Sequence, residues 1–211
     1  MTAPAVAAFD VDGTLAKGDC VVPFLRRIAG IRGLAAAVAR QPVRLGLALA
    51  RRDRDLVKAL VVGPVHRGRP VDTVRAIGAE FAVDVERNRL RPDVLARLRW
   101  HQEQGHRTVL VSASLRSYLE PLACSLGVDD VLCTDVAVED GRYAGELLGA
   151  NCRGVEKVAR LRAWLAAEGL ESVPLWAYGD SRGDAPMLDA ADHPVWVRDD
   201  TVHAVPTGFD R

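Results

Sequence analysis

The chain has 211 residues, 49% of them hydrophobic, and its basic and acidic residues balance to a formal net charge of zero. This length and composition suit one substantial domain with a modest insertion and argue against wholesale disorder. The balanced charge argues against nucleic acid as the main partner, and the lack of a basic leader or of a run of roughly 20 apolar residues argues against export and membrane insertion. The four scattered cysteines favour free thiols, so we expect a cytoplasmic protein.

The first predicted element is a buried β-strand over residues 5–9, which ends directly at the acidic string Asp10–Leu15. Residues 17–88 are rich in Ala, Leu, Val and Arg and are broken by Gly and Pro, which predicts several helices rather than further strands. We therefore predict a helical insertion over residues 17–88, within an α/β core made of residues 1–16 and 89–211.

Short apolar runs alternate with helical patterns in the rest of the chain. The runs that predict strands cover residues 108–111, 131–138, 175–178 and 195–197. The patterns that predict helices cover residues 92–104, 115–126, 155–168 and 185–190. Residues 136–147 predict a small β-hairpin with its turn at Glu139–Gly141. The alternation predicts an α/β fold, a Rossmann-like parallel sheet flanked by helices, whose ligands bind beyond the carboxyl ends of the strands.

Two acidic pairs follow predicted strands and are the most informative residues. Asp10 and Asp12 come at the end of the first strand, and Asp180 and Asp184 follow the strand over 175–178. Each pair alone is also compatible with a turn or a helix cap. A parallel sheet can place the pairs side by side, and acids crowded at the ends of buried strands need a compensating cation. Together they predict a site of oxygen ligands suited to Mg²⁺, whereas the lack of a His and Cys cluster argues against zinc.

A hydroxyl and a lysine stand between the two acidic pairs in the sequence. Ser112 follows the strand over 108–111, and Lys157 lies near the start of a predicted helix. Alone, a serine after a strand is usually a turn residue, and a lysine at such a position is usually solvated. The order of acidic pair, hydroxyl, lysine and acidic pair favours a functional role for both residues over these local interpretations. We expect Asp10, Ser112 and Asp180 to meet at the carboxyl edge of the sheet.

This order of motifs resembles the haloacid dehalogenase superfamily, and within it the branch of subfamily IB that is similar to phosphoserine phosphatase. Asp10–Leu15 resembles the first motif of the family, Val111–Ser114 the second, Lys157 the third and Gly179–Asp184 the fourth, while Asp140–Gly145 is similar to a hairpin of this branch. The helical insertion resembles the cap that these proteins carry between the first two motifs. The resemblance covers nearly the whole chain and implies a Mg²⁺-dependent phosphatase.

The resemblance also implies how the acidic residues divide the chemistry. Asp10 would attack phosphorus and become an aspartyl phosphate, which splits one difficult displacement into two easier ones. Asp12 would act as general acid and then as general base. Mg²⁺ would be held by Asp10, the backbone carbonyl of Asp12 and Asp180, with Asp184 supporting its waters or orienting Lys157.

The residues implied to contact substrate match the family only in part. Ser112 and Lys157 are expected to bind the phosphate, and Thr14 is expected to support phosphate binding by fixing its loop. Phosphoserine phosphatases carry a cap glutamate where this chain has the shorter Asp19, and an asparagine where it has Gly183. Both departures argue against phosphoserine, so we expect another small phosphorylated metabolite as the substrate.

Two alternatives remain open for the function. Basic residues dominate the stretch 21–69, where only Asp53 and Asp55 oppose them, and its segment 34–52 mixes arginines with apolar residues. The fourth motif is also similar to that of bacterial phosphatidylglycerophosphate phosphatases, so one alternative is a lipid phosphate substrate reached by docking on an anionic membrane. A solvated cap is the simpler interpretation of the same segment. The second alternative, a non-enzymatic phospho-accepting switch, would have no use for an acid and base at Asp12. The sequence gives no indication of the oligomeric state.

Overall fold

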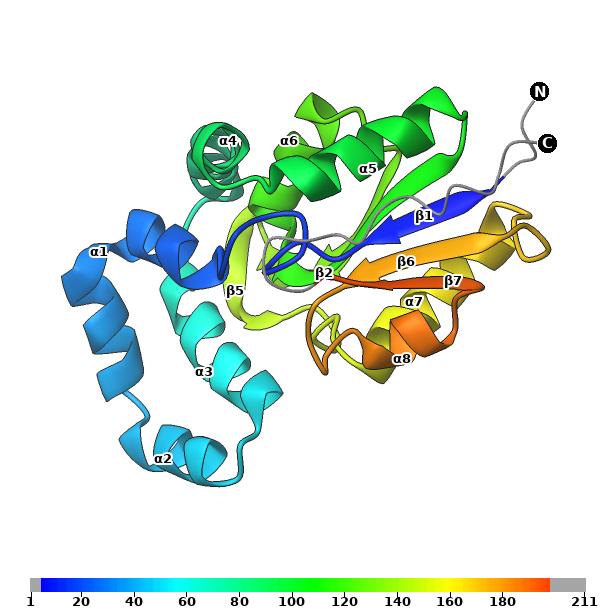
Figure 1. Cartoon of the computed structure of the whole chain (residues 1–211). Helices are drawn as coiled ribbons and strands as arrows, with labels where there is room; N and C mark the ends of the chain where they lie inside the picture. Colours follow the sequence, from blue (N-terminus) through cyan, green and yellow to red (C-terminus); the bar gives the residue numbers. More distant parts are fainter. Residues whose placement is uncertain (1–4, 198–211) are drawn as a thin grey trace.

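A five-stranded parallel sheet forms the centre of the computed structural model, which describes residues 5–197 (Figure 1). In spatial order the strands are β3 (Asp130–Thr134), β2 (Arg107–Leu115), β1 (Val6–Phe9), β6 (Leu175–Gly179) and β7 (His193–Trp196). Every pairing between neighbouring strands of this sheet is parallel. The predicted α/β fold with a Rossmann-like parallel sheet is therefore confirmed.

The central strand β1 is buried on both faces of the sheet, and its successive side chains point to opposite faces. Ala7 and Phe9 belong to one hydrophobic core, where Phe9 stacks on Tyr178 with the ring centroids 4.3 Å apart. Val6 and Ala8 belong to the core on the other face. Burying a side chain such as Phe9 contributes about 1.5–3 kcal/mol. A slip of one residue would move Phe9 into the other core and away from Tyr178, so the packing of Phe9 favours the observed register of β1.

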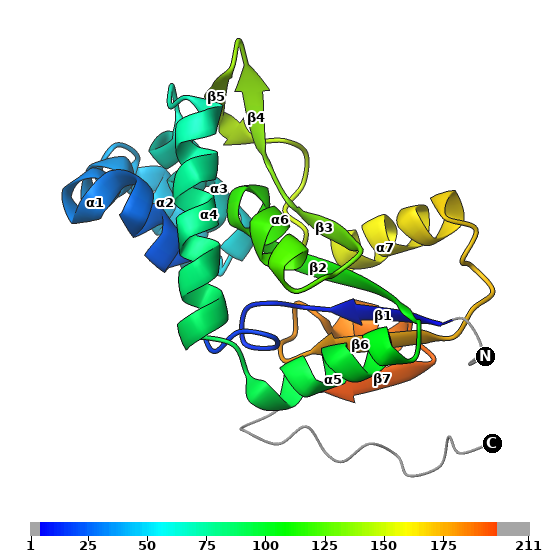
Figure 2. The ribbon, with the colours of Figure 1, turned by 90° about the horizontal axis from the view of Figure 1, so that it is seen from above.

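Helices cover both faces of the sheet, as Figures 1 and 2 show. The helices on one face are α5 (Pro92–Glu103) and α6 (Arg116–Ser125), and those on the other are α7 (Val155–Ala167) and α8 (Ala185–Asp189). Each begins and ends within one residue of its predicted pattern. Pro92 suits the first turn of α5, because N–H groups in the first turn have no acceptor within the helix and proline lacks this group.

The stretch after β1 is helical, as predicted. Its helices are α1 (Val21–Ala39), α2 (Pro42–Ala50), α3 (Arg54–His66) and α4 (Val71–Asn88). Figure 1 shows α1, α2 and α3 to the side of the sheet and α4 near α6. The α4–α6 approach is close, because a Cβ at Gly78 would collide with the backbone carbonyl of Ser117. No helix within residues 5–197 has both the length and the apolar character needed to cross a membrane. The cap boundaries at 17 and 88 stay a prediction.

The predicted strand over 131–138 was wrong in one respect, because it is two strands in different sheets. Its first part is β3, and its second part, β4 (Val136–Glu139), pairs antiparallel with β5 (Arg142–Leu147) to form the predicted hairpin. The break lies at Asp135, whose carboxylate accepts a hydrogen bond from Val136 N at 2.8 Å and from Arg116 Nε at 2.6 Å. These local bonds hold the chain where it leaves the first sheet.

Strand β2 is longer than predicted. It continues past Val111 through Ser112 and ends at Leu115, so Ser112 lies within the strand rather than after it. The pairing of β2 with β3 shifts register between Ser112 and Leu115, which accommodates the extra residues. Strand β7 likewise begins at His193, two residues before the predicted run.

Candidate active site

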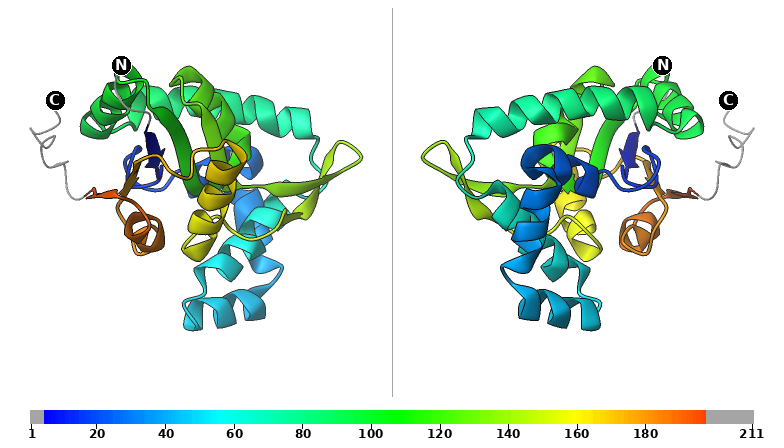
Figure 3. Two further views of the ribbon diagram at one scale, coloured as in Figure 1. Left: turned by 90° about the vertical axis from the view of Figure 1, so that its right-hand side faces the viewer. Right: turned by 90° about the vertical axis from the view of Figure 1, so that its left-hand side faces the viewer.

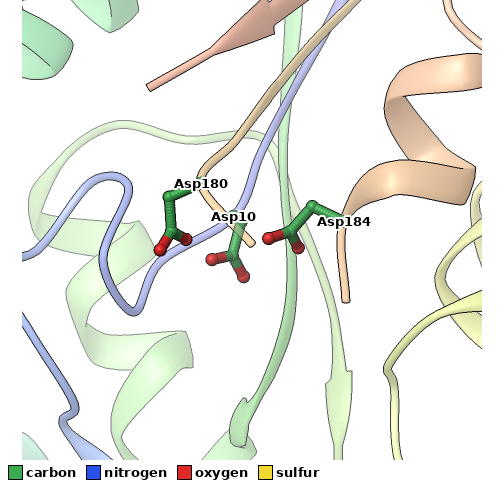
Figure 4. A group of neighbouring side chains, drawn as sticks. All are labelled: Asp10, Asp180 and Asp184. Carbon is green, nitrogen blue, oxygen red and sulfur yellow. The ribbon is translucent and has the colours of Figure 1, made fainter. Parts of the chain in front are cut away.

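Three carboxylates converge at the carboxyl edge of the sheet (Figure 4). Asp10 follows β1 and Asp180 follows β6, and these neighbouring strands are joined by a 2.9 Å hydrogen bond from Asp10 N to Tyr178 O. Asp184 lies just before α8. Oxygen atoms of the three carboxylates lie within 4.8 Å of one another, and Figure 4 shows the carboxylates turned toward a common point. Members of both predicted acidic pairs therefore share one small space.

A buried lysine ties two of these carboxylates together. Lys157, in the first turn of α7, is 1% exposed, and its ammonium group lies 2.6 Å from Asp10 Oδ1 and 2.5 Å from Asp184 Oδ1. The other oxygen of Asp184 accepts hydrogen bonds from the backbone N–H and the hydroxyl of Ser181. Asp184 is therefore fully engaged in holding Lys157 and the loop after β6.

The pKa values reflect this crowding. Burial raises the pKa of Asp10 to about 7, although Lys157 opposes the rise. Burial also acts to raise the pKa of Asp184, but the attraction of Lys157 and the bonds from Ser181 outweigh it and lower that pKa. Burial acts to lower the pKa of Lys157, and the two carboxylates reverse this and raise it. The lysine is thus a cation, while burial leaves the Asp10 carboxylate in need of further positive charge.

Asp12 lies beside this group and is oriented by its own donors. Its Oδ2 accepts a hydrogen bond from the Ser114 hydroxyl at 2.6 Å, and its Oδ1 accepts one from Cys20 N at 3.2 Å. Burial raises the pKa of Asp12, and the bond from Ser114 moderates the rise. Its side chain does not belong to the carboxylate group around Asp10. Ser114 binds Asp12 from β2, the strand next to β1, a role that the sequence analysis missed.

The loop after β1 packs tightly against Asp180. Gly13 has a φ of 88°, and a Cβ at this position would collide with the Asp180 carboxylate. The buried hydroxyl of Thr14 donates to Asp180 Oδ1 at 3.1 Å. The contact agrees with a loop-fixing part for Thr14, and the expectation that it supports phosphate binding stays a prediction.

Ser112 lies on β2, the other neighbour of β1. It is buried, and its Oγ accepts a hydrogen bond from Ser114 N at 3.2 Å. Within residues 5–197, no hydrogen bond joins its hydroxyl to the three carboxylates. The structure therefore brings Asp10 and Asp180 together as expected and places Ser112 on the adjacent strand, with no hydrogen bond from its hydroxyl to the described carboxylates.

A second lysine reaches the core from the inserted helices. Lys58 of α3 donates to the Ala113 carbonyl and, over 2.9 Å, to Asn151 Oδ1. Burial lowers the pKa of Lys58 to about 8, although the charge of Asp12 opposes the change. From the same helix, Asp55 accepts a 2.6 Å hydrogen bond from Asn151 Nδ2. The sequence contained one indication that Lys58 has a special place, because it is the single lysine among the arginines of residues 21–69.

Asp19 and Gly183, which depart from the phosphoserine phosphatase pattern, each make local structural contacts. The exposed Asp19 accepts hydrogen bonds from Val21 N at 3.2 Å and Val22 N at 3.0 Å, at the start of α1. Gly183 packs closely, since a Cβ there would lie 3.1 Å from Nε of Arg153. A larger residue at 183 would therefore require Arg153 to move.

The donor set fits a hard divalent cation. All three converging groups are carboxylates, and Lys157 contacts only one oxygen of Asp10. No hydrogen bond from residues 5–197 reaches the second oxygen, Oδ2. Carboxylate oxygens in this number suit Mg²⁺, which takes only a few protein carboxylates and completes its shell with waters. No nitrogen or sulfur ligand belongs to this group, so within the described residues it does not match the preference of zinc.

Both the sequence and the fold are similar to those of known proteins. The sequence model of the haloacid dehalogenase-like hydrolases matches residues 7–189. Protein CicA of Caulobacter vibrioides is 35% identical over 190 residues, covering 90% of this chain and 84% of that protein. A phosphoserine phosphatase of Mycobacterium tuberculosis is 30% identical over 184 residues, covering 87% of this chain and 41% of that protein. A solved structure from Bordetella pertussis Tohama I, of a protein with unknown function, has a TM-score of 0.77 and 28% identity and covers 93% of this chain and 90% of that one.

Proposed function

Because the chain belongs to the haloacid dehalogenase-like hydrolase family, we propose that it is a Mg²⁺-dependent phosphomonoester hydrolase that works through an aspartyl phosphate on Asp10. That the chain is a phosphatase follows from the family together with its phosphatase relatives. The observation that carries the finer proposal is the buried carboxylate of Asp10, held by Lys157 and facing Asp180 and Asp184 at the edge of the sheet.

Asp10 is proposed as the nucleophile. Its Oδ1 is held by Lys157, which leaves Oδ2 to form the bond to phosphorus while the bond from phosphorus to the leaving oxygen breaks. Asp10, the backbone carbonyl of Asp12 and Asp180 would hold Mg²⁺. The bound ion supplies positive charge that offsets the repulsion between the attacking carboxylate and the incoming phosphate. A water then attacks the aspartyl phosphate, releases inorganic phosphate and regenerates Asp10.

Asp12 is proposed as the acid and base of the two steps. Its raised pKa favours a proton on the carboxyl group when substrate binds, and that proton goes to the leaving alkoxide. The resulting carboxylate takes a proton from the water that attacks the aspartyl phosphate. The bond from Ser114 holds the side chain in one orientation for both transfers. A phospho-accepting switch would gain nothing from such a group, because it requires a long-lived acyl phosphate.

Lys157, Ser112 and Thr14 are proposed to support phosphate binding. An ammonium group has three donors, and Lys157 uses two on Asp10 and Asp184, so the third remains for a phosphoryl oxygen. The Ser112 hydroxyl, on the strand beside β1, is proposed as another donor to the phosphate. Thr14 would act through the loop and Asp180. These donors stabilise the negative charge of the transferring group.

A small phosphorylated metabolite is the proposed substrate. Lys58 places positive charge near Asp12, at the contact between α3 and the core, where its charge would attract an anionic substrate although its three donors serve Ala113, Thr134 and Asn151. The core is proposed to consist of residues 1–16 and 89–211 and the cap of residues 17–88, although 1–4 and 198–211 lie outside the described residues. The second candidate is a lipid phosphate, favoured by the apolar side chains that α2 exposes.

Hydrolysis of p-nitrophenyl phosphate tests the reaction class. We expect activity that requires Mg²⁺, is abolished by excess chelator and is lost in Asp10→Asn. In Asp12→Asn, turnover should fall by about 10²–10⁴-fold, the usual contribution of a general acid or base. The matched control is Asp140→Asn, at the exposed turn of the hairpin, which should retain full activity. Full activity of Asp10→Asn would contradict the proposal, and a panel of phosphorylated metabolites and lipid phosphates would separate the two substrate classes.

A further inference from the structure

The solvent-facing side of α2 is apolar. Ala48 is the buried residue of this helix and marks its inward side. Val43, Leu47 and Ala50 lie at i, i+4 and i+7, on the side opposite Ala48, and all three are exposed. Val43 is 73% exposed and Leu47 52%. A surface helix normally carries polar residues on this side, whereas α2 carries apolar residues there as well as on its inward side.

This apolar stripe, defined as Val43, Leu47 and Ala50, lies at one end of the molecule. Figures 1 and 3 show α2 at the tip of the inserted helices, on the far side of α1 and α3 from the sheet. Two further exposed apolar residues, Val38 and Leu49, lie on the adjoining segments of α1 and α2. Single exposed apolar residues need no explanation, whereas a stripe along a helix marks a surface that is covered by something else.

Arginines surround the stripe and outnumber the acids beside it. Arg40, Arg44, Arg51 and Arg52 are all exposed. Within residues 5–197 none of them forms a salt bridge, and Arg44 donates only to the neutral Gln41. The next acid along the chain, Asp53, is occupied by the N–H of Leu56 at the start of α3. The tip therefore combines an apolar centre with four exposed arginines, which outnumber the nearby acids Asp53 and Asp55.

We propose that the tip formed by α2 and its flanking arginines docks on an anionic lipid bilayer. The apolar stripe would enter the boundary between headgroups and acyl chains, with the helix in the plane of the surface. The arginines would lie at the level of the lipid phosphates, and guanidinium groups pair well with phosphate. A second copy of this chain is a poorer match, because the contact would bring arginines against arginines. The proposal concerns where the protein sits and holds for any substrate.

Co-sedimentation of the full chain with vesicles tests the docking. The probes are vesicles of phosphatidylcholine alone and vesicles containing phosphatidylglycerol, each at low and at high salt. We expect binding to the anionic vesicles that weakens with salt, and little binding to neutral ones. Asp10→Asn should bind as well as the native chain, so a failure of the proposed catalysis would leave this result unchanged.

Two sets of substitutions separate the apolar and the charged contributions. Val43→Gln with Leu47→Gln should weaken binding at least tenfold. Replacing the four flanking arginines with glutamine should weaken it by about fivefold for each arginine near the surface. Both sets should hydrolyse p-nitrophenyl phosphate normally, which shows that they fold.

The control pair is Val83→Gln with Arg162→Gln, exposed residues on α4 and α7, which should not change binding. Absence of binding to anionic vesicles at low salt would overturn the proposal. So would equal binding by the stripe variant, or a concentration-dependent dimer that the stripe variant abolishes.

Discussion

Replacing Lys157 with methionine tests how the buried carboxylates are held together. Methionine is also long and unbranched, so the change removes the charge and retains most of the packing. The ammonium group is buried, 2.6 Å from Asp10 and 2.5 Å from Asp184. Removing one partner of a buried ion pair typically costs about 3–5 kcal/mol, because an uncompensated charge stays behind. We expect a loss of this size in the free energy of unfolding of metal-free protein at pH 9.

The loss should become smaller as the pH falls. Burial raises the pKa of Asp10 to about 7 even though Lys157 lowers it, so this pKa rises further in the variant. Above it, the variant keeps an unpaired anion buried, whereas below it a proton neutralises Asp10 in the folded state. A folded state that binds more protons than the unfolded state gains stability as the pH falls. The difference from the native chain should therefore be smaller at pH 6 than at pH 9.

Urea unfolding in excess chelator, followed by circular dichroism at both pH values, measures these differences. Lys17→Met is the matched control, since Lys17 is exposed, and it should change the free energy of unfolding little at either pH. A loss below about 1 kcal/mol in Lys157→Met at pH 9, or an equal loss at both pH values, would refute the reasoning from buried ion pairs.

Two other substitutions test the loops that shape the site. Gly13→Ala should destabilise the fold by about 1–3 kcal/mol and weaken Mg²⁺ binding measured by calorimetry, because φ is 88° there and the new Cβ would strike a carboxylate. Gly18→Ala has a similar φ of 69° but open space around it, so it should retain Mg²⁺ binding, and equal loss in both would show that only backbone strain matters. Ser114→Ala should lower turnover by about 10–100-fold and shift the pH–rate profile of the acid group upward, because its bond lowers the pKa of Asp12. An unchanged profile would show that this bond does not tune the acid.

The strands and helices of the core were predictable because their patterns are strong and local. The buried runs before Asp10 and Asp180 are apolar on both faces, as a covered parallel sheet requires. The end of β2 was missed because Ser112 and Ser114 resemble turn residues, whereas here their backbone continues the strand and their hydroxyls serve neighbouring groups. Local composition does not distinguish these two uses of serine.

Contacts between distant segments were the part of the site that the sequence did not reveal. Ser114 is 102 residues from Asp12, and Lys58 is 93 residues from Asn151. Both contacts depend on how β2 and α3 pack, which no local periodicity encodes. The order of motifs nevertheless predicted that Asp10 and Asp180 would meet, because parallel strands end at a common edge.

Asp10, the proposed nucleophile, directly follows the strand in the middle of the sheet, with β2 on one side and β6 on the other. Strands at the margins of a sheet open more readily than a strand bonded along both sides, so amide hydrogens of β1 should exchange with solvent far more slowly than those of β3 or β7. Thermal fraying at either margin should then leave the position of Asp10, and of the chemistry proposed for it, unchanged.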